Sequence, residues 1–146
     1  MDSGRTVSYE GFEMHMKDFN GWNRLKRKLS RKRDTSVPTI KEREIWWTSI
    51  GINIGDEEDG KNELYNRPVL IVRKFSARLF WGVPLTTKIK SSGLYFPIDF
   101  KEQKQSVMLT HLRLYDAKRL QDDHSRMGTL PEGQFNAVKA ALKNLL

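Results

Sequence analysis

The apolar positions near the start of the chain follow a helical spacing. Phe19, Trp22, Leu25 and Leu29 recur at intervals of three and four residues. This spacing places them on one narrow face of a helix, and the neighbouring positions are polar. The pattern predicts an amphipathic helix over residues 18–33.

Basic residues surround this stripe, and a turn follows it. Seven of the ten residues from 24 to 33 are Lys or Arg. The segment DTSVPT, residues 34–39, is rich in residues that favour turns or linkers. We therefore expect residues 1–40 to form a basic helical extension with its linker, and residues 41–146 to form a separate domain.

From Lys41 onward the pattern becomes one of short strands. Six segments are rich in β-branched and aromatic residues or alternate between apolar and polar positions. They cover residues 44–50, 68–75, 78–87, 94–100, 106–114 and 125–130. The run at 68–72 is apolar on both faces, which favours a central strand. We interpret residues 51–66 as a long polar loop and residues 116–120 as a turn or a single helical turn.

The segment 78–87 alternates in a way that predicts two different faces. Leu79, Trp81, Val83 and Leu85 share one face, whereas Phe80, Gly82, Pro84 and Thr86 share the other. Pro84 has no N–H to donate, so we expect a sheet edge or a bulge there. Gly82 would let a ligand backbone come close to the second face.

The chain ends in a second helical pattern. Pro131 suits the first turn of a helix, and Phe135, Val138, Leu142 and Leu145 form its apolar stripe. Short strands followed by one closing helix favour a mainly β fold, a small barrel-like sheet with a C-terminal helix.

The composition narrows the class of protein. Hydrophobic residues make up 38% of the 146 residues, which favours a globular protein. Cysteine is absent, so disulfides, a thiol nucleophile and Cys-ligated zinc are excluded, and a reducing compartment is favoured. No apolar run approaches the ~20 residues of a membrane span, and the first twenty residues contain no signal-type apolar core. We expect a soluble cytoplasmic protein without a membrane partner.

Charge and motifs narrow the possible chemistry further. The net charge of +8 favours a polyanionic partner, either nucleic acid or an acidic protein. His15, His111 and His124 are far apart in sequence, and the acidic run 56–59 lacks the alternating oxygen ligands of a calcium loop. We therefore interpret residues 56–59 as a solvated loop tip and expect neither a metal nor a cofactor. Glycine-rich phosphate loops and nucleophile elbows are also absent.

A metal-free way to cleave RNA is compatible with these residues. The 2′-OH of RNA can attack the neighbouring phosphorus if one protein group helps to remove its proton and another supplies a proton to the leaving 5′ oxygen. Fixed donors must also stabilise the charge on the phosphoryl oxygens, and an arginine with a hydroxyl at a strand end can do so. Arginine is a poor base, so phosphate stabilisation is its natural role.

Six segments, in order, resemble the PemK/MazF toxins of bacterial toxin–antitoxin pairs. They are REIWWTSIG (43–51), GDEEDG (55–60), RPVLIV (67–72), VPLTTK (83–88), SVMLTHLRLYDAKRL (106–120) and MGTLPEGQFNAVKAAL (127–142). The order and spacing of the six together make the resemblance specific, and it leaves residues 1–42 outside.

The resemblance implies an SH3-like barrel that forms a homodimer and a cognate antitoxin protein that covers its RNA groove. It also implies metal-independent cleavage of single-stranded RNA, often mRNA, at short sequences, which leaves a 2′,3′-cyclic phosphate and a 5′-hydroxyl. The two family positions carried over as catalytic are Arg67, before the Pro-Val strand, and Thr86, at the end of VPLT. Further RNA contacts are expected from Thr87, Lys88, Arg113, Lys61 and Asn62.

The sequence departs from the family where a base is expected. Many members have Asp or Glu where Thr110 stands, and a hydroxyl cannot replace that base. Glu57, which matches the loop glutamate of the family, and His111 are the remaining candidates for the base. The additional residues 61–66 before Arg67 are expected to alter the groove and the RNA sequence that is read.

Each of these assignments has a structural alternative. Arg67 could be an edge-strand charge, and His111 a core histidine on a face with Val107 and Leu109. One of Trp46 and Trp47 is expected in the core, since adjacent strand residues face opposite ways. The whole domain could be a non-catalytic module that binds nucleic acid or protein. A gyrase-directed toxin is a weaker alternative, because the C-terminal helix carries no motif for it.

The basic helix also has three possible roles. It could widen the RNA footprint, since Lys and Arg near phosphates release counterions. It could dock on an acidic antitoxin or another protein. The third possibility is a solvated basic face whose apolar stripe packs on the domain.

Overall fold

The computed structural model describes residues 5–9 and 12–146, with side chains from Met16 onward. The strands are β1 (Arg5–Tyr9), β2 (Phe12–Met16), β3 (Glu44–Ser49), β4 (Asn66–Lys74), β5 (Leu79–Thr86), β6 (Tyr95–Phe100), β7 (Gln103–Met108), β8 (Arg113–Asp116) and β9 (Arg126–Thr129). The α-helices are α1 (Phe19–Ser30) and α2 (Glu132–Asn144), and the short 3-10 helices are η1 (Asp34–Ser36), η2 (Leu109–His111), η3 (Ala117–Arg119) and η4 (Asp123–Ser125).

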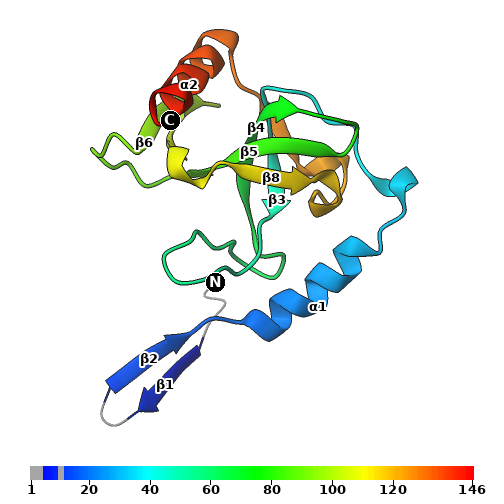
Figure 1. The fold of residues 1–146 in the computed structure, drawn as a ribbon, viewed down its shortest axis with the longest axis vertical. Helices are drawn as coiled ribbons and strands as arrows, with labels where there is room; N and C mark the ends of the chain where they lie inside the picture. Colours follow the sequence, from blue (N-terminus) through cyan, green and yellow to red (C-terminus); the bar gives the residue numbers. More distant parts are fainter. Residues whose placement is uncertain (1–4, 10–11) are drawn as a thin grey trace.

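One antiparallel sheet forms most of the molecule (Figure 1). Its strand order is β6-β7-β5-β4-β3-β9, and β8 also pairs with β5. β5 pairs with β4 along its length, with β8 through Leu79 to Gly82, and with β7 through Leu85 and Thr86. The mainly β fold with a C-terminal helix, predicted from the sequence, is confirmed.

The central strand β4 is buried on both faces, as the apolar run predicted. Leu70 and Val72 join a cluster with residues of α2, including Phe135 and Val138. Val69 and Ile71 point the other way, into a second cluster that contains Trp46, Phe80 and Tyr115. Two cores therefore flank β4, and the start of this strand is held rigidly between them.

The predicted alternation of β5 holds, with Val83 and Leu85 in the first cluster and Phe80 in the second, but the expected approach of a ligand at Gly82 is wrong. Leu79 and Trp81 are exposed, whereas Phe80 packs in the second cluster with Tyr115. A Cβ on Gly82 would lie 2.5 Å from Cγ1 of Val69, so this glycine is required for core packing and does not face a ligand. This error arises because both faces of β5 meet apolar neighbours.

The predicted strand 106–114 is two strands with different partners. β7 pairs with β6 and the end of β5, η2 then turns the chain, and β8 pairs with the start of β5. Pro84 lies where β5 changes partners, between Gly82 opposite β8 and Leu85 opposite β7, which fits the predicted irregularity. His111 is half-buried in η2, so its placement in the core beside Val107 and Leu109 is wrong.

The predicted basic helix is present as α1. Asp18 caps it by accepting a hydrogen bond from the Gly21 N–H at 3.0 Å. The hairpin formed by β1 and β2 before it was not predicted. The predicted stripe is buried at Trp22 and Leu29 and half-buried at Leu25, but Phe19 is 49% exposed.

The stripe of α1 packs on the loop between β3 and β4. Trp22 and Leu29 form a cluster with Ile52 and Tyr65, which lie at the two ends of that loop. Gly51 has a φ of +89°, and a Cβ there would lie 2.3 Å from the Trp22 ring. The stripe is therefore packed on the domain, except at Phe19, and this packing leaves the basic face of α1 exposed.

Candidate functional site

Arg67 lies at the start of β4, opposite Thr48 of β3. Its Nε donates to the Asp59 carbonyl oxygen at 2.7 Å, and its guanidinium also pairs with the Glu58 carboxylate. Only 12% of its side chain is exposed. An arginine held this tightly differs from the solvated edge charge of the structural alternative, because two groups of the loop fix its orientation.

A hollow of about 200 Å³ opens beside Arg67, and we call it the Arg67 hollow. It is lined by Trp47, Lys61, Asn62, Asn66, Arg67, Pro68, Leu85, Thr86, Thr87, Lys88 and Gln105. The structure thus brings Arg67 and Thr86 together with the predicted RNA contacts Thr87, Lys88, Lys61 and Asn62. Thr86 Oγ1 accepts a hydrogen bond from the Lys88 N–H at 3.2 Å, so its own proton remains to be donated elsewhere.

The additional residues before Arg67 form a closed turn. The Lys61 N–H donates to the Asn66 carbonyl at 2.9 Å, and the Asn66 N–H donates back at 3.0 Å. Asn62 adopts a φ of 62°, and its amide nitrogen donates to Oδ1 of Asn66 at 3.0 Å. The turn therefore fixes Lys61 and Asn62 on the wall of the Arg67 hollow.

A larger cleft of about 690 Å³ lies next to this hollow, and we call it the His111 cleft. Its lining comprises Ile50, Asn53, Asp56, Glu57, Glu58, Pro84, Thr110, His111, Leu112, Arg113 and Tyr115. Glu57 and His111, the two candidate bases, share it with Arg113. Its volume lies in the range of known ligand pockets, roughly 300–1,000 Å³.

Each candidate base has one side-chain atom within hydrogen-bonding distance of a neighbouring protein group. Oε1 of Glu57 accepts a hydrogen bond from the Ile54 N–H at 2.9 Å. Nδ1 of His111 lies 3.1 Å from the Thr110 hydroxyl. Oε2 of Glu57 and Nε2 of His111 are therefore the atoms that can exchange a proton with a ligand.

The four predicted catalytic residues are divided between the two cavities. Arg67 and Thr86 line the Arg67 hollow, whereas Glu57 and His111 line the His111 cleft. Glu58 links the cavities, because it lines the cleft and pairs with Arg67. The two cavities are neighbours, and the loop 51–65 forms part of the wall of each.

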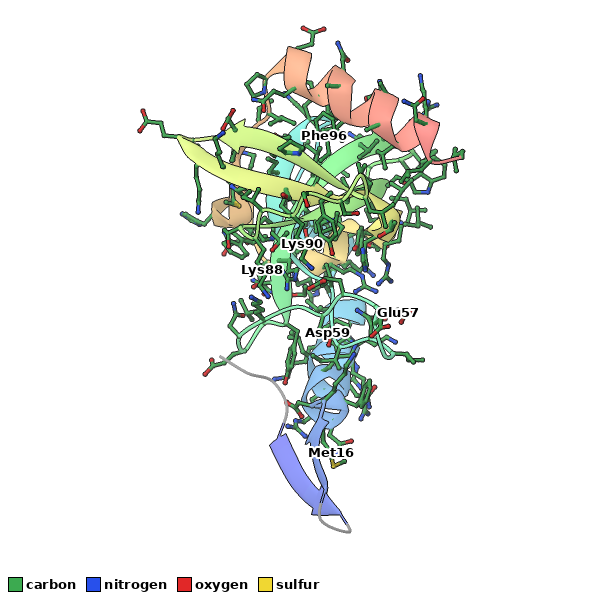
Figure 2. The ribbon with its side chains drawn as sticks, turned by 90° about the vertical axis from the view of Figure 1, so that its left-hand side faces the viewer. Met16, Glu57, Asp59, Lys88, Lys90 and Phe96 are labelled. Atoms are coloured by element: carbon green, nitrogen blue, oxygen red, sulfur yellow. The ribbon has the colours of Figure 1, made fainter. Side chains whose placement is uncertain are left out.

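Glu58 is a residue that the sequence reasoning missed. The interpretation of residues 56–59 as a solvated loop tip is wrong at Glu58 and Asp59. Asp59 accepts the Asn53 N–H at 2.6 Å and pairs with Nζ of Lys17 at 3.0 Å. Figure 2 shows Asp59 between the main sheet and Met16, which directly precedes the segment leading into α1. Gln105 was also missed, whereas Trp46 is in the core and Trp47 lines the Arg67 hollow, as the alternation of adjacent strand residues predicted.

Two arginines pack against Tyr115, which lines the His111 cleft. The Arg113 guanidinium lies 4.8 Å from the centre of the Tyr115 ring, and the Arg119 guanidinium lies 5.7 Å from it. Burial raises the pKa of Tyr115 above its ordinary value, and the two arginines partly oppose this. Burial, and then Arg113, lower the pKa of Arg119. Arg113 therefore gives the cleft a cationic group, in a lining that also holds the carboxylates of residues 56–58.

Two classes of feature are missing from the part of the chain that the structure describes. Among the described residues, no group of three or more His, Cys, Asp or Glu could hold a metal ion. No helix among them is long and apolar enough to cross a membrane.

The comparison with protein families identifies the domain. The family model of PemK-like, MazF-like toxins of type II toxin–antitoxin systems matches residues 41–146. The chain belongs to this family. No curated protein matches the sequence significantly.

The solved structures agree with the MazF-like fold. MazF from Deinococcus radiodurans is 18% identical, with a TM-score of 0.58 over 74% of this chain and 96% of that one. A mycobacterial endoribonuclease in complex with its cognate antitoxin is 14% identical, with a TM-score of 0.54 over 72% and 92%. The Mycobacterium tuberculosis toxin MazF-mt6 is 19% identical, with a TM-score of 0.51 over 70% and 94%. At these identities the likeness establishes the fold of the MazF-like domain.

Proposed function

We propose that this MazF-like protein is a toxin that cleaves single-stranded RNA, including mRNA, at short sequences through attack by the 2′-OH. The observation that carries the proposal is the Arg67 hollow, where a fixed arginine and a hydroxyl with a proton to donate lie together. The mycobacterial neighbour, described as an endoribonuclease, supports the same activity.

The reaction forms one bond and breaks one bond at phosphorus. The 2′ oxygen attacks, the bond to the 5′ oxygen breaks, and the products are a 2′,3′-cyclic phosphate and a 5′-hydroxyl. Arg67 keeps its Nε on the Asp59 carbonyl and turns a terminal nitrogen from Glu58 to a phosphoryl oxygen. Thr86 donates its proton to the same phosphoryl group. Both interactions stabilise the charge that develops in the transition state.

Proton transfer requires two further roles. Glu57, through Oε2, or His111, through Nε2, accepts the 2′ proton from the side of the His111 cleft. Arg67 also supplies the proton that the leaving 5′ oxygen takes up. No step in this scheme uses a metal ion.

The remaining residues of the two cavities bind and select the RNA. Lys88 and Arg113 contact phosphates, while Thr87, Lys61 and Asn62 contact the nucleotides next to the cut. Residues 41–146 form the catalytic unit and residues 1–40 an extension to it. By analogy with the MazE–MazF complex of D. radiodurans, the protein binds a cognate antitoxin, and the family resemblance implies that it forms a homodimer.

The test is cleavage of a long single-stranded RNA in excess EDTA, followed by mapping of the cut ends. We expect discrete cuts with cyclic-phosphate ends, and Arg67→Ala lowers the rate by about 10²–10³-fold. Arg73→Ala is the matched control, because Arg73 is an exposed arginine on the same strand. Equal rates in Arg67→Ala and the wild type would contradict the assignment of Arg67.

A non-catalytic binding module is the second candidate, and Thr110 is the observation that favours it. Thr110 stands on the wall of the His111 cleft at a position where the family resemblance places an acid. Intact RNA after incubation with the wild type, together with a gel shift of the same RNA, would support this module instead.

A further inference from the structure

The outward face of α1 carries a row of arginines. Arg24, Arg27 and Arg31 follow one another at helical spacing, opposite the buried side chains of Trp22 and Leu29. All three are exposed, and α1 contains no acidic residue. Residues 17–33 hold eight Lys or Arg and one Asp, a net charge of +7, while the whole chain carries +8. Most of the net positive charge of the molecule is therefore concentrated in residues 17–33.

Among the residues whose side chains are described, these arginines have no acidic partner. Arg78 and Lys118, by contrast, both pair with Asp34. Cations that are exposed, regularly spaced and without acidic partners fit a ligand that carries regularly spaced anions.

The arginine row is rigidly connected to the candidate site. Nζ of Lys17 donates to the carbonyl oxygens of Asn53 at 2.7 Å and Gly55 at 2.9 Å, and it pairs with Asp59. The hydroxyl of Tyr65 donates to Asp18 at 2.6 Å. Helix and loop therefore form one unit, and the same loop is the wall of both cavities.

Two of the carboxylates in the acidic loop between the site and the helix are neutralised by cations of the protein, whereas Asp56 and Glu57 are exposed. Glu58 pairs with Arg67, and Asp59 pairs with Lys17. The Arg119 guanidinium lies 5.8 Å from the centre of the Trp22 ring and 5.7 Å from that of Tyr115. Cationic groups thus continue from the wall of the His111 cleft to the buried face of α1.

We infer that the Arg24–Arg27–Arg31 row binds the phosphate backbone of single-stranded RNA that extends from the candidate site. The inference rests on the proposed function, which supplies RNA as the ligand. An acidic protein would complement the positive charge of the row but does not suit the polar surface around it. Protein interfaces have a largely apolar core, and the outward positions Asn20, Asn23 and the three arginines offer none.

The test is the salt dependence of binding to a long single-stranded RNA with 2′-O-methyl groups, which has no nucleophile and stays intact. The variant is Arg24→Gln/Arg27→Gln/Arg31→Gln, because glutamine retains helix propensity. The matched control, Lys101→Gln/Lys104→Gln/Lys143→Gln, removes the same charge from exposed positions after β6, in β7 and in α2. Figure 1 shows β6 and α2 at the end of the molecule opposite α1. Circular dichroism checks that both variants keep the fold.

We expect the slope of log affinity against log salt to fall in magnitude by about 2 in the arginine variant, because each lost phosphate contact removes about 0.7. At about 0.1 M salt this corresponds to a loss of affinity of about 100-fold, whereas the control stays within about threefold of the wild type. Equal losses in the two variants, or an unchanged slope in the arginine variant, would overturn the inference.

Cleavage of unmodified RNA by the wild type separates the two proposals. If the wild type cleaves RNA and the arginine variant binds it as tightly as the wild type, only the proposal that the arginine row binds RNA is refuted. An acidic protein surface then becomes the partner that the charge of α1 fits. Loss of affinity in the arginine variant without cleavage by the wild type refutes the ribonuclease and leaves the RNA-binding row standing.

Discussion

At the scale of single residues, Thr86 is the side chain whose chemistry is easiest to separate from its structural role. Its hydroxyl accepts a hydrogen bond from the Lys88 N–H, so its own proton is available to a ligand, while its methyl group suits a strand. We expect Thr86→Val to lower kcat/KM for RNA cleavage by about 100-fold, because a donor to the phosphoryl oxygen is lost. Thr86→Ser keeps the hydroxyl and should stay within about tenfold of the wild type.

The identity of the base can be decided by comparing Glu57→Gln with His111→Gln. Loss of a general base lowers kcat by about 10²–10⁴-fold, and it also removes the acidic limb of the pH–rate profile. Replacing a residue that lines the cleft but is not the base leaves the acidic limb in place. Profiles with the same limb in both variants would assign the base to neither residue.

The sequence located part of this site and not the rest. Arg67 and Thr86 could be predicted because each follows from the family resemblance at a strand end. The Glu58–Arg67 pair could not, since it depends on how the loop 51–65 folds back over β4. Alternation could not decide whether His111 lies in the core, because it does not show where β7 ends and η2 begins.

At the scale of elements, α1 and the loop 51–65 depend on each other for stability. Trp22 is 7% exposed and contacts Tyr65 and Gly51, so Trp22→Ala should lower the free energy of unfolding by about 3 kcal/mol. The control Phe19→Ala removes an aromatic ring from the same helix at a 49% exposed position, and it should cost less than about 1 kcal/mol. Urea unfolding measures both, and equal losses would show that α1 does not use the packing described above.

The hydrogen bond from Tyr65 to Asp18 makes this docking sensitive to high pH. The bond raises the pKa of Tyr65 above its ordinary value of 10.0, burial and the Asp18 charge raise it further, and Arg24 partly opposes them. Because the folded pKa is the higher one, the stabilisation is fully present below pH 10.0 and is lost as the pH rises through the folded pKa.

Tyr65→Phe tests this dependence. The variant should be less stable than the wild type by about 1 kcal/mol at neutral pH, since one side-chain hydrogen bond is lost. The difference should shrink above the ordinary pKa of tyrosine, because the wild type then loses the same bond. A difference that stays constant from neutral to strongly alkaline pH in urea unfolding would contradict the prediction.

Element prediction succeeded where periodicity was long and failed where partners changed. α1 and α2 lie where their stripes predicted, because each buries one face. The hairpin of β1 and β2 was missed, although Phe12, Met14 and Met16 alternate with polar residues along β2. The break between β7 and β8 was missed because both halves are apolar, and only their pairing distinguishes them.

At the scale of the whole molecule, the MazF-like part of the chain and the extension before it each position different residues of the candidate site. The two cores fix β4 and β5, which carry Arg67 and Thr86, whereas the extension holds the loop with Glu57 and Glu58. Composition predicted a basic globular protein but not this division. Local patterns do not reveal that residues near 17–29 pack on residues 51–65.

The pairing of β3 with β9 has a consequence for the synthesis of the chain. Residues 44–46 pair with residues 126–129, and Arg43 exchanges hydrogen bonds with Leu130. A growing polypeptide that lacks its last twenty or so residues therefore has an unpaired edge on the strand next to Arg67. We expect a polypeptide whose synthesis stops before residue 126 to lack the proposed activity, because the strand that supports Arg67 then has no partner on its other side.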